Sequence, residues 1–416
     1  MKILFYIKNL KAGGAERAFI EVINNWKLEH DEIKILLGSD HGILLDSVCS
    51  ANLLEVSDVS KSLINRLFTK IKLGNILSSA KFLKQSAKFI RDKLGDNYFN
   101  SICNKIPFSR AEKIFTAIKN FKPDIIVSTL VETGHLPVLL AINYNIKNKP
   151  IWVAVEQNNT RMRIEDHYTD PIEKKAWSLI TKLVYNKCDH LIAVSEGVKD
   201  GLSKNFSVDH KKISVIHNPV SMCDNENVLL DKGSNGFILS IGRLHSQKQH
   251  DHLIQAYHNI SNKIPDIELH IAGSGRLLDN YKKMVNDFGI GHRVKFLGVR
   301  NDIYSLLKKA RAFVLSSKYE GFPLSLIEAM AFGSPVVSYD CDYGPKEIIV
   351  DGKNGRLVDN GNIVSLQEAI LDVFQNIDKT VRMRDQAKVD VIKYSSCETA
   401  SKYKNLLINL YAQKYN

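Results

Sequence analysis

The stretch AFVLSSKYEGFPLSLIEAM, residues 312–330, contains the structural unit that is repeated along this chain. Residues 312–316 are apolar or small and predict a short buried strand. Pro323 is typical of the first turn of a helix, so the residues after it are predicted to be helical. A short apolar strand that leads through a loop into a helix predicts one βα unit of a parallel sheet.

The same alternation recurs in both directions from this stretch. Helical patterns lie between most of the β-rich runs, which is the order expected for a doubly wound parallel sheet. The first predicted strand is followed by a glycine loop at 11–15 and a helix over 16–26. The predicted strands are 2–7, 33–37, 125–128, 151–155, 190–194 and 213–216 in the first half, and 237–241, 268–272, 294–297, 312–316, 335–338 and 355–358 in the second.

A polar break separates the two halves. Residues 222–236, MCDNENVLLDKGSNG, are rich in Asn and Gly and predict a linker. We therefore predict an α/β protein with two Rossmann-like domains, 1–222 and 237–395, which are joined by a linker at 223–236 and face one another across a cleft. A chain of 416 residues suits two domains of this size. Residues 396–416 are predicted to form a helix that packs back on the first domain.

Composition places the chain among ordinary globular proteins. Hydrophobic residues make up 44% and charged residues 25%, which excludes disorder, collagen and coiled coil for most of its length. The six cysteines form no C-x-x-C pair, which favours reduced thiols in a cytosol. The start of the chain does not fit a signal peptide, and no apolar run approaches the ~20 residues of a membrane span. We expect a cytoplasmic protein that is soluble or rests on a membrane.

Positive charge is concentrated in one segment. The chain has 57 Lys and Arg against 45 Asp and Glu, a net charge of +12, and residues 61–122 alone hold fourteen basic and three acidic residues. Apolar residues at 76, 80, 83, 87, 90 and 94 follow one face of a helix, and basic residues fill the other positions. We predict a basic amphipathic segment that binds an anionic membrane surface. The alternative is a core-facing helix with a solvated basic face.

Two glutamates lie around the turn in the opening stretch. Glu320 is in the predicted loop and Glu328 in the first turns of the helix, so both are expected at the carboxyl edge of the sheet, where open α/β sheets bind ligands. A carboxylate accepts hydrogen bonds from two hydroxyls, which suits a ribose or a sugar. The N–H groups of Leu324 and Ser325 begin the helix and suit a phosphate. The alternative is an acid that favours the helix dipole and a second, exposed helix acid.

Two cations lie in another βα loop. Arg243 and Lys248 follow the predicted strand 237–241 and are five residues apart, so both can reach one anion. Arginine offers a planar fork to a diphosphate, and lysine a mobile point charge. The alternative is a pair of solvated loop cations. Together with the two glutamates, these cations predict a pocket for a nucleotide diphosphate sugar.

With these residues the chain resembles the retaining glycosyltransferases of family 4, which have the GT-B fold. The resemblance covers nearly the whole chain, and its specific motifs lie in the second half. The matching pieces there are SIGRLHSQKQ, LHIAGSG, RVKFLGVRNDI, EGFPLSLIEAM, GSPVVSYD, GPKEII and DGKNGRLV. The first half matches more loosely, through GGAER, AVSEGV and VIHNPV.

The resemblance implies a role for each matching residue of the second half. Glu328 is expected to bind the ribose hydroxyls of the nucleotide, and Glu320 the hydroxyls of the donor sugar. Arg243 and Lys248 are expected to hold the diphosphate and to stabilise the negative charge that develops on the leaving nucleotide. Arg300 is expected beside the base.

In the first half the resemblance implies fewer roles. Gly13 and Gly14 are expected to let the backbone approach the donor and the acceptor. Glu156 begins the run EQN, where many relatives carry a histidine and some carry Glu-Arg-Asn, so it is a candidate catalytic residue. Retention in this family is usually described as front-face attack without a protein nucleophile.

No metal or other cofactor is expected. The run DCD at 340–342 has the spacing of a metal motif, but it ends a predicted strand in a GT-B context, where no metal is required. The run GSG at 273–275 lacks the third glycine of a dinucleotide fingerprint, so NAD is not expected either.

These inferences predict a retaining hexosyltransferase. It would move a hexose or N-acetylhexosamine from a nucleotide diphosphate sugar, expected to be UDP-linked, to a lipid-linked glycan at the inner face of the plasma membrane. Its expected pathway is surface polysaccharide biosynthesis, such as O-antigen, lipopolysaccharide or capsule. The alternatives are a sugar-nucleotide epimerase of similar architecture and a non-catalytic nucleotide-sugar binding protein. Nucleic-acid binding is not expected, because the basic segment lacks interleaved exposed aromatic residues.

Overall fold

The computed structural model describes residues 1–8, 13–26, 31–38, 73–144, 146–222 and 236–415. They divide into two compact units. Unit 1 contains Met1–Val194, Lys199–Ile216 and Ala400–Asn416, and unit 2 contains Ser195–Val198 and His217–Thr399.

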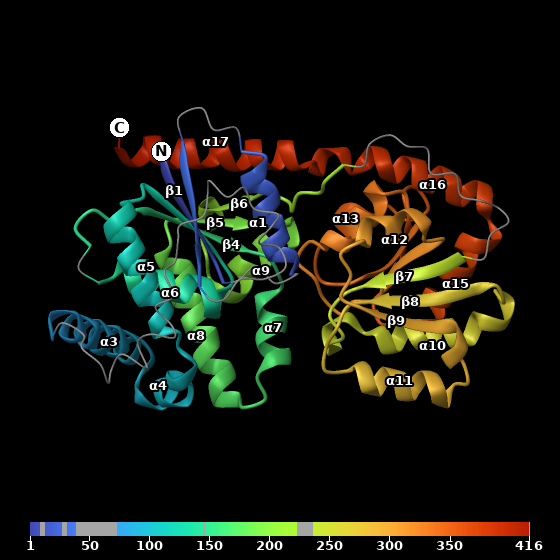
Figure 1. The fold of residues 1–416 in the computed structure, drawn as a ribbon, viewed down its shortest axis with the longest axis horizontal. Coiled ribbons are helices and arrows are strands. Elements are labelled where there is room, and N and C mark those ends of the chain that lie inside the picture. The colour runs from blue at the N-terminus through green and yellow to red at the C-terminus, as the bar shows by residue number, and fades with distance from the viewer. Residues whose placement is uncertain (9–12, 27–30, 39–72, 145, 223–235, 416) are drawn as a thin grey trace. The chain divides into compact units, whose positions relative to one another are not determined.

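Unit 1 is built on a parallel sheet of six strands in the order β2-β1-β3-β4-β5-β6. Figure 1 labels β1, β4, β5 and β6 of this sheet. Strands β3 and β4 are buried along their whole length, as expected for parallel strands that are covered on both faces. Chain order reverses between the neighbours β1 and β3. The strands are β1 (Lys2–Ile7), β2 (Glu32–Leu37), β3 (Ile125–Thr129), β4 (Ile151–Glu156), β5 (His190–Ala193) and β6 (Ile213–Val215).

The helices of unit 1 begin with local signals in the sequence. The Asn159 side chain accepts a hydrogen bond from the Met162 N–H and caps α7, and Asp170 caps α8, whose first residue is Pro171. The helices that lie wholly or mostly in unit 1 are α1 (Gly14–Asn24), α3 (Leu73–Leu94), α4 (Asp96–Ile102), α5 (Phe108–Phe121), α6 (Leu136–Ile142), α7 (Thr160–His167), α8 (Pro171–Lys187), α9 (Glu196–Phe206) and α17 (Ser396–Tyr415).

Unit 2 repeats the design with the strand order β12-β11-β10-β7-β8-β9. Its strands are β7 (Gly236–Ile241), β8 (Ile267–Ala272), β9 (Val294–Gly298), β10 (Ala312–Leu315), β11 (Val336–Asp340) and β12 (Arg356–Asp359). Its helices are α10 (His250–Ile260), α11 (Leu278–Asp287), α12 (Ile303–Lys309), α13 (Leu324–Ala331), α14 (Pro345–Ile348), α15 (Ile363–Gln375) and α16 (Ile377–Asp390). In Figure 1, α10 and α11 lie on one side of strands β7–β9, and α12 and α13 on the other.

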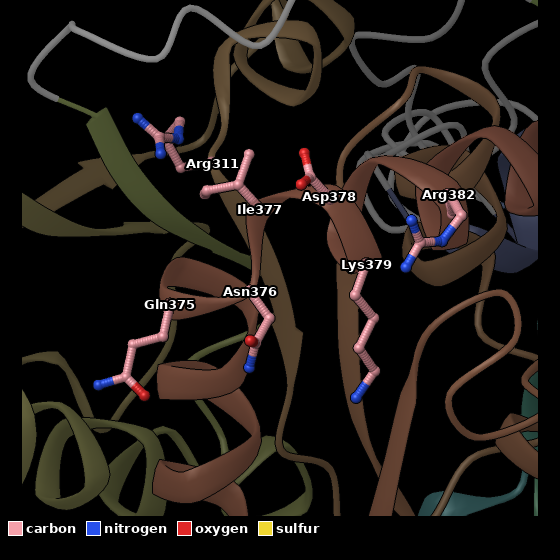
Figure 2. A pocket seen from close by; sticks show the side chains of 7 residues that line it. All are labelled: Arg311, Gln375, Asn376, Ile377, Asp378, Lys379 and Arg382. Atoms are coloured by element: carbon pink, nitrogen blue, oxygen red, sulfur yellow. The ribbon is translucent and has the colours of Figure 1, made fainter.

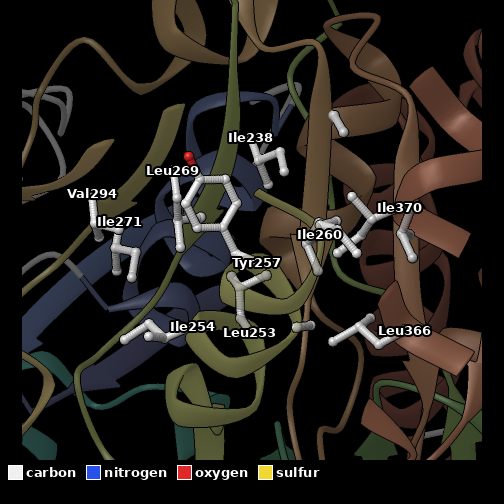
Figure 3. Packing of buried hydrophobic residues seen from close by; sticks show 14 of the residues in the cluster. Ile238, Leu253, Ile254, Tyr257, Ile260, Leu269, Ile271, Val294, Leu366 and Ile370 are labelled. Carbon is white, nitrogen blue, oxygen red and sulfur yellow. The ribbon is translucent and has the colours of Figure 1, made fainter. Parts of the chain in front are cut away.

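The core of unit 2 joins its sheet to α10 and α15. Figure 3 shows Ile238 and Leu269 of the sheet near Tyr257 of α10, and Ile370 of α15 belongs to the same cluster. All four side chains are fully buried, and burial of one such side chain stabilises the fold by roughly 1.5–3 kcal/mol. The Tyr257 hydroxyl donates a hydrogen bond of 2.6 Å to the Ile267 carbonyl, so its polar atom is also satisfied.

The C-terminal helix contributes to the core of unit 1. Ala400, Tyr403 and Leu407 of α17 are buried in the same cluster as Phe5 of β1 and Phe19 of α1. Their spacing of three and four residues places them on one helix face. This packing explains why the last part of the chain belongs to unit 1 rather than to the unit that precedes it.

The predicted fold class, with two doubly wound parallel sheets, is confirmed. Every predicted strand is present, and the ends differ by at most two residues. Helix α1 begins at Gly14, two residues before the predicted start. Most of the predicted linker lies outside the described residues, and Gly236, which was assigned to it, is the first residue of β7.

The two units do not follow the predicted domain bounds throughout. The chain first joins unit 2 at Ser195–Val198 and joins it again at His217, before the predicted linker. The unit to which each of these segments belongs is decided by contacts with residues that are distant in sequence. Composition therefore does not reveal these bounds. The assignment of acceptor binding to residues 1–222 and of donor binding to residues 237–395 stays a prediction.

The structure corrects the predicted apolar face of α3. Among residues 81–94, the part of α3 whose side chains are described, the buried ones are Phe82, Ser86, Ile90 and Leu94, whereas Leu83 is 39% exposed. The predicted apolar positions 76 and 80 lie outside the described side chains. Phe82 faces inward because its ring packs on two aromatic neighbours in unit 1, at centroid distances of 5.7 and 4.8 Å. Residues 61–72 of the basic segment lie outside the described residues. No helix in the described part of the chain is long and apolar enough to cross a bilayer.

Candidate active site

The predicted donor residues of unit 2 follow two neighbouring strands. Strand β7 pairs with β10, and chain order reverses between them, so the loops after these strands flank the topological switch point of the sheet. Arg243 and Lys248 follow β7, and Glu320 and Glu328 follow β10. The topology therefore brings all four residues to one edge of the sheet, as predicted from their loops.

Lys248 and Glu320 form an ion pair. The Lys248 Nζ donates to the Glu320 Oε1 over 2.5 Å, and the Ser317 hydroxyl donates to the same oxygen over 2.7 Å. The side chains of Lys248 and Glu320 are only 15% and 9% exposed, so solvent screens this pair weakly. The Ser316 hydroxyl donates to the backbone carbonyls of Lys248 and Gln249, which fixes the loop that carries the lysine.

Gln247 links the two loops that carry these charges, and nothing in the sequence patterns had indicated it. The side-chain Nε2 of Gln247 donates to the Tyr319 backbone carbonyl over 3.0 Å. The backbone carbonyl of Gln247 accepts from the Lys318 N–H over 2.8 Å. Its Oε1 lies 3.4 Å from Nη2 of the exposed Arg243. The only sequence signal was an amide side chain in a loop between two cations, which does not reveal that the side chain is buried.

Glu328 lies on a helix that is buried on all sides. All eight residues of α13 are buried, and Glu328 is 4% exposed. The alternative that Glu328 is an exposed helix acid is therefore wrong. Leu324 and Ser325 form the first turn of α13, where backbone N–H groups have no partner within the helix. Their predicted contact with a phosphate stays a prediction.

Glycines allow the neighbouring loops to approach this edge closely. A Cβ atom on Gly273 would lie 2.0 Å from the Gly242 carbonyl oxygen, and one on Gly275 would lie 2.4 Å from the Leu244 carbonyl oxygen. The GSG run therefore packs the loop after β8 against the loop after β7. Gly242 in turn lies beside Lys248, whose Cε would be 3.0 Å from an added Cβ.

The loop after β11 supports Glu320 from the other side. The Glu320 N–H donates to the Asp342 carbonyl over 2.6 Å, and the Tyr343 N–H donates to the Glu320 carbonyl over 3.1 Å. Gly344 has φ +95°, and its Cβ position would be 2.7 Å from the Gly321 carbonyl oxygen, so a side chain does not fit there. Among the described residues, no cluster of His, Cys, Asp or Glu side chains, including Asp340 and Asp342, is arranged to hold a metal ion.

Arg300 lies at the same edge of the sheet, where its side chain is paired with Asp302, two residues further along the chain. It follows β9, which is separated from β7 by β8. Its Nε and Nη2 donate to the two carboxylate oxygens of Asp302 over 2.8 and 2.6 Å, and both side chains are exposed. The hydrogen bond from Arg300 holds the pKa of Asp302 below its ordinary value. The predicted contact of Arg300 with the base stays a prediction.

A hollow in unit 2 lies away from these residues. Figure 2 shows it at the turn between α15 and α16. Its volume is about 580 Å³. Arg311 directly precedes β10, whereas Glu320 follows that strand, so the hollow is near the opposite edge of the sheet. Its lining residues are Arg311, Gln375, Asn376, Ile377, Asp378, Lys379 and Arg382.

The predicted residues of unit 1 are also at a carboxyl edge. Gly13 and Gly14 follow β1 and begin α1, and the Gly13 carbonyl accepts from the Arg17 N–H over 3.1 Å. Gly13 has φ −88°, which any residue adopts, so its backbone angle alone does not require glycine. The close approach of this loop to the substrates stays a prediction.

Glu156 is the last residue of β4 and has no exposed surface. Its Oε1 accepts from the N–H groups of Gln157 and Asn158 over 3.0 and 3.1 Å, and its Oε2 accepts from the Tyr185 hydroxyl. Burial raises the pKa of the carboxyl above its ordinary value, although Arg163 and Tyr185 act in the opposite direction. This carboxylate holds the turn that follows β4, and its predicted catalytic role stays a prediction.

The loop after β3 contains polar residues that the sequence analysis missed. Glu132 accepts a hydrogen bond of 2.7 Å from Nη1 of Arg163 on α7. The His135 Nδ1 lies 2.8 Å from the Ser128 hydroxyl, and burial, with the nearby Arg163, lowers the pKa of His135 to about 3. No motif marked Glu132 and Arg163, because 31 positions separate them in the chain.

Comparison with known proteins places both halves of the chain in related families. The family model described as "Glycosyl transferases group 1" matches residues 224–390, and the one described as "Glycosyltransferase Family 4" matches residues 90–222. An uncharacterized glycosyltransferase of Haemophilus influenzae is 27% identical over 73% of this chain and 84% of its own length.

Two further proteins extend the comparison. The N-acetylgalactosamine-N,N'-diacetylbacillosaminyl-diphospho-undecaprenol 4-alpha-N-acetylgalactosaminyltransferase of Campylobacter jejuni is 30% identical over 58% of this chain and 69% of its own length. The structure of Anabaena Alr3699/HepE in complex with UDP-glucose has the same fold, with a TM-score of 0.72 and 18% identity over 98% of this chain and 100% of that one.

Proposed function

The chain belongs to family 4 of the glycosyltransferases, as its motifs predicted, and we propose that it is a retaining enzyme that transfers a hexose or N-acetylhexosamine from a UDP-sugar to a lipid-linked glycan. The observation that carries this proposal is the Ser317–Glu320–Lys248 arrangement at the switch point of unit 2. One cation and one carboxylate at this sheet edge suit a ligand that carries a diphosphate and a hydroxyl-bearing sugar, which supports the proposal.

The proposed reaction is a substitution at the anomeric carbon of the donor sugar. The bond from this carbon to the β-phosphate oxygen breaks, and its electron pair leaves with UDP. An acceptor hydroxyl attacks from the same face, and its proton passes to the departing phosphate oxygen. Lys248 and Arg243 stabilise the charge that grows on the diphosphate, which lowers the barrier by electrostatic stabilisation.

The carboxylates bind the neutral parts of the donor in this proposal. Glu320 accepts hydrogen bonds from hydroxyls of the sugar, and Glu328 from those of the ribose. In the present geometry Glu320 is paired with Lys248, so donor binding shares Lys248 between the carboxylate and the diphosphate. Leu324 and Ser325 offer N–H groups to a phosphate oxygen, and Arg300 would bind at the base after leaving Asp302.

Two similarities support the choice of substrates. The Anabaena structure was determined with UDP-glucose, and the acceptor of the Campylobacter relative is a diphospho-undecaprenol glycan. The exposed basic side chains of α3, namely Lys81, Lys84, Lys88, Arg91 and Lys93, suit an anionic bilayer. We therefore place the proposed reaction at a membrane surface, in the synthesis of a surface polysaccharide.

The experiment that tests this proposal follows turnover of UDP-glucose, UDP-galactose, UDP-GlcNAc and UDP-GalNAc with an undecaprenyl-diphosphate glycan as acceptor. Replacement of Lys248 by Ala should lower kcat at least 100-fold and change UDP affinity much less, because the charge it stabilises develops mainly in the transition state. Lys353→Ala, at an exposed lysine of the same unit, is the matched control. Equal kcat for Lys248→Ala and the control would show that Lys248 does not stabilise the charge on the departing UDP.

A further inference from the structure

We propose that Gln247 is a positioning residue for glycosyl transfer, which holds Lys248 in the place where this lysine meets the leaving diphosphate. The inference rests on the proposed function and adds to it a residue that touches neither the donor nor the acceptor. Gln247 acts through Lys248, because its buried amide ties the loop of this lysine to the loop of Glu320.

Gln247 is tied to the loop after β10 by its side chain and by its backbone. The side-chain Nε2 donates to the Tyr319 carbonyl over 3.0 Å, and the backbone carbonyl accepts from the Lys318 N–H over 2.8 Å. Both partners directly precede Glu320, the carboxylate that pairs with Lys248. Gln247 and Lys248 are neighbours in the chain, so the bonds of Gln247 fix the place from which the lysine side chain starts.

The environment of the Gln247 side chain suits a neutral group that both donates and accepts hydrogen bonds. Its Nε2 donates to a backbone carbonyl, and its Oε1 lies 3.4 Å from Nη2 of Arg243. An amide meets both demands at once, whereas a carboxylate only accepts and an ammonium only donates. Gln247 is 4% exposed, so removal of the amide leaves the buried carbonyl without its partner.

The backbone after Lys248 is held in an unfavourable conformation. Gln249 has φ +43°, in the left-handed region that few residues other than glycine adopt. The Ser316 hydroxyl donates to the carbonyls of Lys248 and Gln249 over 2.9 and 3.0 Å and fixes this turn. Such strain persists where the surrounding structure holds it and is found preferentially at functional sites. The turn and the amide of Gln247 together restrict where Lys248 can lie.

The position of Lys248 matters because the lysine acts on charge that grows during the reaction. Electrostatic stabilisation depends on groups that are in place before the charge develops. A displacement of about 1 Å can lower a rate roughly 100-fold. Interactions that are the same in the ground state and the transition state change binding without changing kcat. Loss of the Gln247 amide should therefore lower kcat and leave UDP affinity nearly unchanged.

The first test measures transfer kinetics of Gln247→Met, in which an apolar side chain of similar length removes both amide contacts. Gln255→Met is the matched control, since the Gln255 amide bonds to Asn259 of the same helix, α10. The kcat of Gln247→Met should fall about 10-fold or more, whereas UDP affinity by calorimetry should stay within about threefold of wild type. Equal kcat in the variant and the control, or a parallel loss of UDP affinity, would overturn the proposal.

A double variant tests whether Gln247 acts through Lys248. Gln247→Met should change kcat less than about threefold in the Lys248→Ala background, because the group that Gln247 positions is already absent. A residue that only stabilises the unit would lower kcat by the same factor in both backgrounds. Equal factors would therefore contradict the positioning role, even where the single variant is slow.

The third test does not depend on turnover and so separates this inference from the proposed function. Acetylation of the full chain by acetic anhydride, followed by mass spectrometry, reports how readily the reagent reaches each lysine Nζ. The Lys248 side chain is 15% exposed in its pair with Glu320, so it should react slowly in wild type. Labelling of Lys248 relative to the exposed Lys353 should rise about threefold or more in Gln247→Met and stay unchanged in Gln255→Met.

The labelling result stands whether or not a UDP-sugar is consumed. An increase confined to Gln247→Met would support the positioning of Lys248 even if the proposed donor and acceptor are wrong. Equal labelling of Lys248 in wild type and Gln247→Met would contradict it.

Discussion

At the scale of single residues, Glu156 is the position where sequence similarity and geometry suggest different roles. Similarity places it near the reaction centre, whereas the structure surrounds both of its oxygens with donors from its own unit. A carboxylate in this setting can act on the reaction indirectly, because it positions Gln157 and Asn158. Substitutions can separate the two roles.

Replacement of Glu156 by Gln should retain most of the activity if the carboxylate positions the loop. The amide oxygen can still accept from the backbone N–H groups, and the Tyr185 hydroxyl can accept from the amide nitrogen. Glu156→Ala should lose activity and stability together, since it leaves buried donors without a partner. Steady-state kinetics and thermal unfolding of both variants provide the measurement. A loss of kcat in Glu156→Gln as large as in Glu156→Ala, with the fold intact, would favour direct acid–base catalysis.

At the scale of elements, the loops around the donor residues depend on glycines that permit backbone contact. Gly273→Ala should lower the stability of unit 2 by more than about 2 kcal/mol, because the new Cβ atom would lie 2.0 Å from the Gly242 carbonyl. Gly289→Ala is the control, since it has φ +66° but no atom within 4 Å of its Cβ position, and it should lose only about 1 kcal/mol. Urea unfolding measures the free energy of unfolding of the two variants. Equal losses of stability would show that the cost comes from the backbone angle and not from the contact with the Gly242 carbonyl.

Helix α3 provides a second prediction at this scale. Its buried face packs within unit 1, so only its exposed basic face can meet a bilayer. The double variant Lys84→Glu/Lys88→Glu should weaken binding to vesicles containing anionic lipid about 30-fold or more at low salt. Charge reversal at Lys282 and Lys283, which are exposed on α11 of unit 2, is the control. Equal sedimentation of both variants, or binding that is insensitive to salt, would contradict an electrostatic role for α3.

At the scale of the whole molecule, buried neutral histidines in both units predict a loss of stability in mild acid. Burial lowers the pKa of His135 and of His250 to about 3. The unfolded chain takes up these protons near pH 6.5, so stability falls as the pH drops from about 6.5 toward 3, by up to about 1.4 kcal/mol per pH unit for each histidine. Urea unfolding at pH 7.5 and 5.5 measures this loss.

A variant assigns part of the acid sensitivity to one histidine. The His250 Nδ1 has no partner among the described residues, and its ring packs on Tyr281 at a centroid distance of 5.9 Å. His250→Phe should therefore keep the fold and lose less stability than wild type between pH 7.5 and 5.5. The same decrease in both proteins would mean that other groups cause the acid sensitivity.

The sequence alone was sufficient for the elements and for the family. Strands such as 125–128 and 151–155 were predictable because their apolar residues are contiguous. The run EGFPLSLIEAM, together with Arg243 and Lys248, identified the family of the second half. These signals are local, since each depends on residues that are neighbours along one strand, turn or helix. The same signals predicted that Lys248 and Glu320 lie at one edge of the sheet, because the carboxyl ends of parallel strands all lie at the same edge.

Only the tertiary structure decided which side chains meet. It turned Phe82 rather than Leu83 inward, joined Gln247 to the loop of Tyr319, and placed α17 in the core of unit 1. It also enclosed the Glu156 carboxylate with hydrogen-bond donors from its own unit. The physical reason is that burial and hydrogen bonding depend on groups far away in the chain, and the free energy of packing them outweighs the local preferences that a sequence pattern records.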